Sequence, residues 1–203
     1  MRGARLVPIL AGSLLVALAA AEPVSAGTPP AGTHVLVGDD FYDPSTVVVD
    51  AGETVIFDNG GIQHHTTTDD SGMDLYDSSV VAPGDSSWFT FTAAGGYPFT
   101  CTLHPWMGGS VRVPVQVTPS AGGLAKRYLI TWATNPAPAG FVYDVQIRRP
   151  GADWRRWQRG TERRSARHRP RAGPGRYRFR ARLRQLGTGE TSDWSPARSF
   201  VAS

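Results

Sequence analysis

The stretch GGYPFTCTLHPWM, residues 95–107, reads as a buried strand that ends at a thiol and continues into a short loop. Tyr97, Phe99 and Cys101 occupy alternate positions, so an extended chain points all three side chains to the same side. The two aromatic rings predict that this side faces a core. We therefore expect Cys101 to point inward at the end of a buried strand.

The segments around this stretch also have the pattern of strands. Residues 45–60 (STVVVDAGETVIFDNG) and 86–101 (SSWFTFTAAGGYPFTC) are β-branched or aromatic runs between turn residues. Residues 110–117 (SVRVPVQV) alternate, which places four valines on one face of a predicted strand. Residues 176–184 (RYRFRARLR) alternate arginine with apolar residues, as expected for a half-buried strand. No segment keeps a helical period, so the sequence predicts an all-β chain.

The charge distribution divides the chain into two parts. Residues 33–118 hold one basic residue, Arg112, against eleven acidic residues, a net charge of −10. Residues 119–203 hold eighteen Lys and Arg against five Asp and Glu, a net charge of +13. The break falls near TPSAGG, residues 118–123, and predicts two separate folding units.

The beginning of the chain has the features of an export signal. Arg2 and Arg5 precede an apolar run, and Val24-Ser25-Ala26 fits a cleavage site. The alternative, an uncleaved anchor, is disfavoured because the run is shorter than the roughly 20 residues that a spanning helix needs. We therefore expect a secreted, extracellular or periplasmic-like protein. A single cysteine in such a protein cannot form an internal disulfide, which leaves a buried thiol, an intermolecular link, or a metal or catalytic thiolate.

The residues near the thiol favour a metal site. His104 and Met107 follow Cys101 on one short loop, and His64 and His65 follow another predicted strand. A thiolate, imidazoles and a thioether form a soft donor set that suits copper. Zinc is the rival metal, but a thioether is a poor fourth ligand for it. His34 and His168 lack such neighbours in the sequence, and we expect them to be solvated.

Residues 33–118 resemble the cupredoxins, especially the plastocyanin and amicyanin branch. The spacing Cys-x-x-His-x-x-Met matches the shortest ligand loop of that family, and HTTTD aligns His65 with the first family histidine. In this register His64 takes the usual proline position and Thr66 replaces a frequent asparagine. The resemblance implies a Greek-key β-sandwich and one mononuclear type 1 (blue) copper. Its ligands would be His65, Cys101, His104 and Met107, with His64 as the alternative to His65.

Residues 124–203 resemble a fibronectin type III domain, an immunoglobulin-like β-sandwich. The resemblance rests on the spacing of Trp132, Tyr177 and SDWSP, residues 192–196. The predicted organisation is a signal peptide (1–26), a linker (27–32), a cupredoxin domain (33–118), a linker (119–123) and the fibronectin-like domain (124–203).

Several functions are compatible with this organisation. The leading one is electron transfer by a secreted copper protein that is not an enzyme, with an unidentified redox protein as partner. The alternatives are an extracellular adhesion or scaffold protein, or a copper-storage protein, whose metal site is structural. A multicopper oxidase or nitrite reductase fragment is disfavoured because the chain has only five histidines. The basic C-terminal part is expected to bind anionic cell-envelope polymer or lipid headgroups, and no nucleic acid in vivo.

Overall fold

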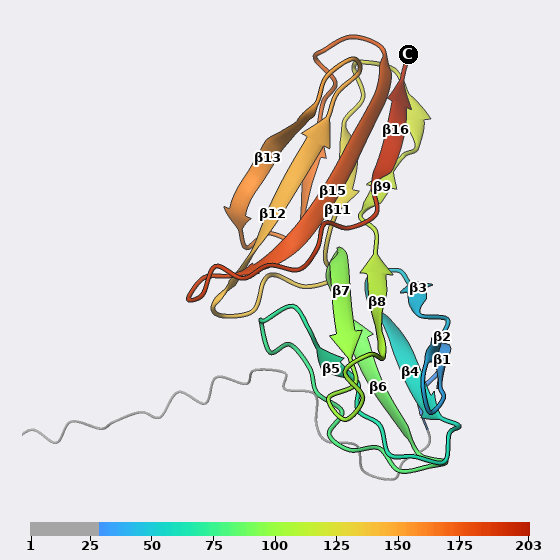
Figure 1. The fold of residues 1–203 in the computed structure, drawn as a ribbon. Coiled ribbons are helices and arrows are strands. Elements are labelled where there is room, and N and C mark those ends of the chain that lie inside the picture. The colour runs from blue at the N-terminus through green and yellow to red at the C-terminus, as the bar shows by residue number, and fades with distance from the viewer. Residues whose placement is uncertain (1–28) are drawn as a thin grey trace, which may run out of the picture.

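A computed structural model describes residues 29–203, so the predicted signal peptide lies outside the described residues. Within the described range the chain forms sixteen strands and no helix, arranged as two successive units (Figure 1). Residues 29–203 accordingly contain no helix long and apolar enough to cross a membrane. The prediction of an all-β chain with a second β unit is confirmed.

The first unit consists of two sheets. One has the strand order β2-β1-β4-β6, with the bounds β1 (Thr33–Val37), β2 (Tyr42–Asp43), β4 (Glu53–Asn59) and β6 (Ser86–Phe91). The other has the order β3-β8-β7-β5, with the bounds β3 (Thr46–Val48), β5 (Thr68–Asp69), β7 (Gly95–Thr100) and β8 (Gly108–Val113). β1 runs parallel to β4 and β3 parallel to β8, whereas β7 and β8 are antiparallel.

A core of aromatic and β-branched residues fills the space between these two sheets. Phe99 of β7 packs edge-on against Phe57 of β4 and against Tyr42, with ring centroids 5.1 and 4.9 Å apart. Such edge contacts add to the stabilisation that comes from burial alone. Cys101 and Met107 belong to the same core and are almost completely buried. The prediction that the thiol points inward is confirmed.

The second unit also has two sheets. One has the order β10-β16-β15-β12-β13, with the bounds β10 (Ala121–Gly122), β12 (Phe141–Arg148), β13 (Trp154–Thr161), β15 (Gly175–Gln185) and β16 (Arg198–Ala202). The other has the order β14-β11-β9, with the bounds β9 (Gln116–Thr118), β11 (Tyr128–Thr131) and β14 (Ser165–His168). The apolar residues of β15 are buried in the core together with Trp132, as the alternation predicts.

The prediction of one strand over residues 110–117 is wrong. β8 ends at Val113, and Pro114 follows, which has no N–H to continue the ladder. Val115 is buried in the second core, and β9 pairs antiparallel with β11. Residues 115–118, which the sequence analysis places in the first domain, therefore pack with the second unit.

Of the two histidines expected to be solvated, His34 is exposed to solvent and His168 is partly buried. His34 is exposed, but its Nδ1 lies 2.6 Å from Asp58 Oδ2. His168 lies among aromatic rings, with ring centroids 5.6 Å from those of both Trp157 and Phe179. Neither contact is visible in the sequence, because each partner comes from a different strand.

The two units join through backbone hydrogen bonds. Gly96 N–H donates to Asp193 O at 2.9 Å, and Asp193 N–H donates to Gly96 O at 2.8 Å. Ala94 N–H donates to Trp132 O at 2.7 Å. A Cβ on Gly96 would lie 2.8 Å from Asp193 Cβ, closer than real side chains approach. The glycine therefore permits the close contact of the two backbones.

We expect Gly96→Val to destabilise the protein by about 1–3 kcal/mol, because the added carbons displace Asp193 from the bridge. Thermal unfolding measures this as a lower midpoint. Gly187→Ala is the control, since a Cβ there meets no atom within 4 Å. Equal midpoints for the two variants would contradict a close interface at Gly96.

Acid should destabilise the second unit through His168. Burial, and then the charges of Arg149 and Arg171, lower the pKa of His168 to about 4. The unfolded chain takes up this proton near the ordinary pKa of 6.5, so folding stability falls as the pH drops from about 6.5 to about 4. His168→Phe removes this part of the pH dependence. Urea unfolding at pH 7.5 and 4.5 measures the free energy of unfolding of the unmodified protein and of His168→Phe. If both proteins lose the same free energy of unfolding between these pH values, His168 is not the cause.

Candidate metal centre

Backbone hydrogen bonds within the loop between β7 and β8 hold it in a tight turn. His104 N–H donates to Cys101 O at 3.2 Å, and Met107 N–H donates to His104 O at 2.9 Å. Cys101 N–H donates to Met107 O at 3.1 Å, across the base of the loop. Because β7 and β8 are paired directly below it, the loop has little freedom to change the relative positions of these three residues.

Three predicted ligand residues meet at this loop. Cys101 Sγ lies 3.6 Å from His104 Nδ1 and 3.8 Å from His65 Nδ1, and the two Nδ1 atoms are 3.1 Å apart. Met107 is buried in the same core as Cys101. His64 is exposed and is not part of the cluster. The structure thus brings His65, Cys101 and His104 together and leaves His64 outside.

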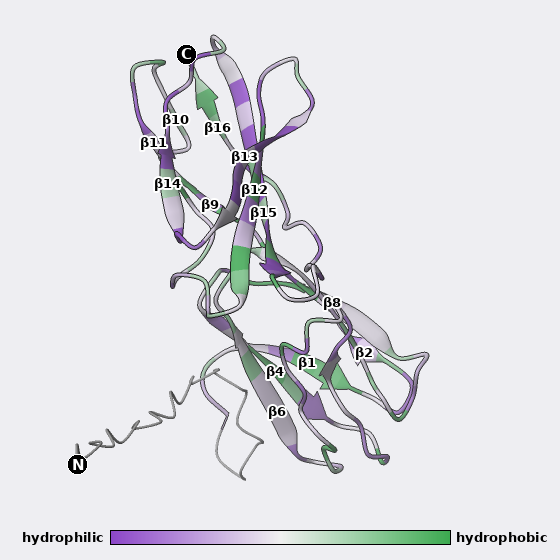
Figure 2. Ribbon diagram, turned by 90° about the vertical axis from the view of Figure 1, so that its left-hand side faces the viewer, coloured by the Kyte–Doolittle hydropathy of each residue, from purple (hydrophilic) through white to green (hydrophobic). Residues whose placement is uncertain are grey.

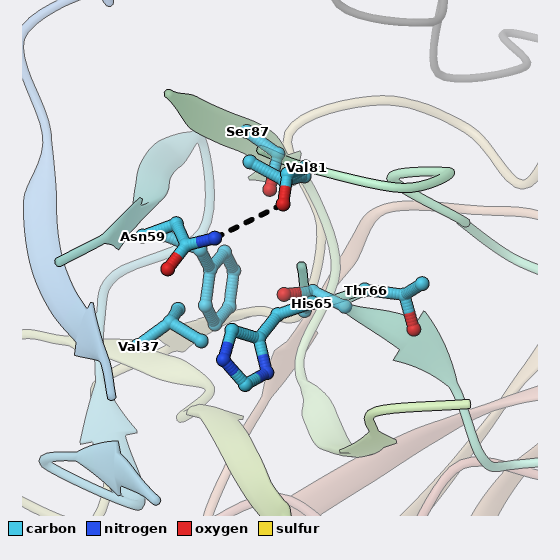
Figure 3. A pocket seen from close by; sticks show the side chains of 8 residues that line it. Val37, Asn59, His65, Thr66, Val81 and Ser87 are labelled. Atoms are coloured by element: carbon cyan, nitrogen blue, oxygen red, sulfur yellow. Dashed lines mark hydrogen bonds between the residues drawn. The ribbon is translucent and has the colours of Figure 1, made fainter. Parts of the chain in front are cut away.

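His65 is held from the first sheet and from the segment before β6. Its backbone exchanges two hydrogen bonds with Val81, at 3.1 and 2.8 Å. Asn59 Nδ2 donates to Val81 O at 3.0 Å, and Figure 3 shows the His65 ring beside Val37 in the small pocket that these residues line. Burial lowers the pKa of His65 and so favours the neutral imidazole, which is the form that binds metal.

Thr66, directly after His65, forms hydrogen bonds to the thiol and to the loop that carries it. Its backbone N–H donates to Cys101 Sγ at 3.3 Å. Its Oγ1 accepts a hydrogen bond from Thr102 N–H at 2.8 Å. Thr66, which stands where the resembling family often has asparagine, therefore links the two ligand-bearing segments.

Asp39 and Gln63 are site residues that the sequence analysis missed. Asp39 Oδ1 accepts hydrogen bonds from the N–H groups of Ile62 and Gln63, at 2.8 and 3.0 Å. The same oxygen lies 3.6 Å from His65 Nε2, a buried atom without a hydrogen-bond partner in residues 29–203. Hydrogen bonding by Gln63 N–H lowers the pKa of Asp39, which favours its charged form.

The second imidazole has a similar acceptor. Gln63 Oε1 lies 3.0 Å from His104 Nε2. Both rings therefore direct Nε2 toward an oxygen and Nδ1 toward the thiol. A proton on each Nε2 leaves each Nδ1 free to bind a metal. No local motif marks Asp39, because it reaches the site from the turn between β1 and β2.

The donor set fits copper. Two imidazole nitrogens and a sulfur converge, and a buried methionine lies in the same core. Soft thiolate and thioether donors with imidazoles are the set that copper prefers, whereas zinc sites rarely use methionine.

The cupredoxin-like domain model matches residues 8–113, and the chain belongs to the cupredoxin family. Amicyanin from Paracoccus versutus is 34% identical over 97 residues, which cover 45% of this chain and 73% of the amicyanin. Chloroplastic plastocyanin from Oryza sativa subsp. indica is 33% identical over 122 residues, 56% of this chain and 75% of that protein. The structure of a purple cupredoxin from Nitrosopumilus maritimus is 26% identical, covers 40% of this chain and 98% of its own, and aligns with a TM-score of 0.37.

We expect Asp39→Ala to weaken copper binding by about tenfold to a hundredfold, because the Nε2 proton of His65 loses the carboxylate that faces it. Competition titration against a chelator measures the affinity. Asp40→Ala is the control: it removes the same charge from the adjacent position, but Asp40 contacts Trp106 Nε1 rather than His65. An equal loss of copper affinity in both variants would show that the negative charge of this turn, and not the contact between Asp39 and His65, determines the affinity.

Proposed function

We propose that the protein is an exported electron carrier that holds one mononuclear type 1 copper through His65, Cys101, His104 and Met107. The observation that carries this proposal is the convergence of Cys101 Sγ with the Nδ1 atoms of His104, on the same hydrogen-bonded loop, and of buried His65, from a distant segment. When bound, copper supplies a one-electron redox couple. The chain holds the donors in place, so little rearrangement accompanies the change of charge.

The surroundings of the cluster support a carrier rather than an enzyme. Cys101 and His65 are buried, so a substrate has no direct access to them. His104 lies beside Trp106, whose ring centroid is 5.4 Å from the imidazole and which is 68% exposed. Leu103 on the same loop is also exposed. An imidazole edge within an apolar surface provides a short route for an electron to a docked protein.

The second unit is proposed to be a fibronectin type III-like domain. Tyr177 OH donates to Gly173 O at 2.8 Å and accepts from Ala172 N–H at 3.1 Å. A tyrosine whose hydroxyl bonds to the backbone a few residues upstream is typical of immunoglobulin-like sandwiches. Trp132 is buried in this core, as the resemblance leads us to expect. Together with the predicted signal peptide, such a domain supports a location outside the cytoplasm.

The visible absorption spectrum of the Cu(II) protein tests the proposed site. We expect an intense blue or green band from charge transfer between the Cys101 thiolate and the metal. Cys101→Ser should abolish it, and His65→Ala should lose tight copper binding while His64→Ala retains it, because only His65 lies in the cluster. An intense band in Cys101→Ser would overturn the assignment.

A redox titration of the same sample separates the carrier from its alternatives. Reversible one-electron cycling is expected for a carrier. Copper that binds but does not cycle would favour the adhesion, scaffold or storage alternatives, in which the metal site is structural.

A further inference from the structure

One face of the second unit carries a row of arginines. In β15 the alternation that buries Tyr177 and Phe179 turns the intervening residues to the outer side of the sheet. Arg148 of β12 lies directly opposite Arg178 in the strand register. Figure 2 shows hydrophilic segments along β12, β13 and β15. We call this surface the arginine face: Arg148, Arg176, Arg178, Arg180, Arg182 and Arg184.

Two tryptophans hold part of this row in place. The guanidinium of Arg180 lies between Trp154 and Trp194, 4.4 and 4.8 Å from their ring centroids. Arg182 stacks on Trp194 at 4.6 Å. Gln146 Oε1 also accepts hydrogen bonds from Arg180 Nε and Nη2, at 3.0 and 2.8 Å. The guanidiniums are therefore ordered before any partner arrives, which reduces the entropy lost on binding.

The charge of this face is not balanced within the unit. Asp144 pairs with Arg184 at 2.9 Å and with Arg182 at 3.5 Å, and its side chain is only 12% exposed. In residues 29–203 these are the only ion pairs that an arginine or lysine makes. Like charges opposite each other, as at Arg148 and Arg178, destabilise a sheet. Asp144 pairs with only two of the six arginines, so the remaining positive charge of the face favours an anionic partner from outside.

The shape of the row indicates what kind of partner fits. Alternate residues on a strand are about 6.6 Å apart, so the arginines of β15 form a single line about 26 Å long. Of the exposed large apolar side chains in the described part of the second unit, only Val201 lies on a strand of this sheet. Trp154 and Trp194 are only partly exposed and lie against guanidiniums, so the face offers few free apolar anchors to a lipid surface. The first domain, at −10, repels polyanions and leaves the copper end free of them.

We propose that the arginine face binds a linear anionic polymer, such as a sulfated, phosphorylated or carboxylated chain of the cell envelope. Each guanidinium contacts one or more anionic groups along the chain; the strand sets the spacing of the arginines, and Trp154 and Trp194 hold Arg180 and Arg182 in place. This interaction is independent of the metal site.

Binding of the full-length protein to dextran sulfate, with neutral dextran as a blank, tests the proposal. The variant Arg176→Glu/Arg178→Glu removes two exposed members of the face. Its control is Arg163→Glu/Arg167→Glu, which changes the net charge equally at exposed positions outside this sheet. We expect at least about a tenfold loss of affinity for the first pair and less than about threefold for the control. Affinity of the unmodified protein should fall steeply with added salt.

Two further measurements test whether the position of the guanidiniums, rather than net charge alone, determines affinity, and whether the face prefers a polymer to a lipid surface. Arg180→Lys keeps the charge but loses the planar stack between the tryptophans, so its affinity should fall about threefold or more. Equal losses in the two Glu pairs, an unchanged Arg180→Lys protein, or no binding by the unmodified protein would each overturn the proposal. Tighter binding to phosphatidylglycerol vesicles than to dextran sulfate would replace the polymer with a membrane surface.

Discussion

The antiparallel pairing of β7 and β8 is the constraint on which the metal centre depends. Because the two strands stay hydrogen-bonded up to Thr100 and Gly108, the chain must reverse within a few residues, and backbone bonds among Cys101, His104 and Met107 fill that reversal. The thiol and one imidazole are thus positioned by main-chain geometry. The other imidazole comes from far along the chain, and its place is fixed by the bridge to Val81.

This difference explains how much of the site could be predicted from the sequence. The loop ligands are local, so their spacing alone indicates a soft metal site. Only the resemblance to the family favours His65 over His64 in the sequence, and in the structure His65 is buried whereas His64 is exposed. Asp39 and Gln63 could not be predicted, because they reach the imidazoles only through the packing of the β1–β2 turn against the segment before His65.

For the fold, too, features set by neighbouring residues could be predicted from the sequence, whereas features set by contacts between distant segments could not. Alternation of apolar residues predicts buried and exposed faces well, as β15 illustrates. It does not indicate that a strand stops and its continuation joins another sheet, as happens across Pro114. The aromatic surroundings of His168 are similarly invisible, because those rings come from β13, β15 and β16.

The strand β7 has its two ends in different surroundings. Gly96 near its start is bonded in both directions to the second unit, and its last residue, Thr100, immediately precedes Cys101 (Figure 1). The four residue steps from Gly96 to Thr100 separate these points by about 13 Å. The second unit is therefore attached away from the His65–Cys101–His104 cluster. If the arginine face holds the protein on a polymer, as proposed, the cluster faces a limited range of directions, and the partner of the proposed electron carrier meets it with less rotational search than in free solution.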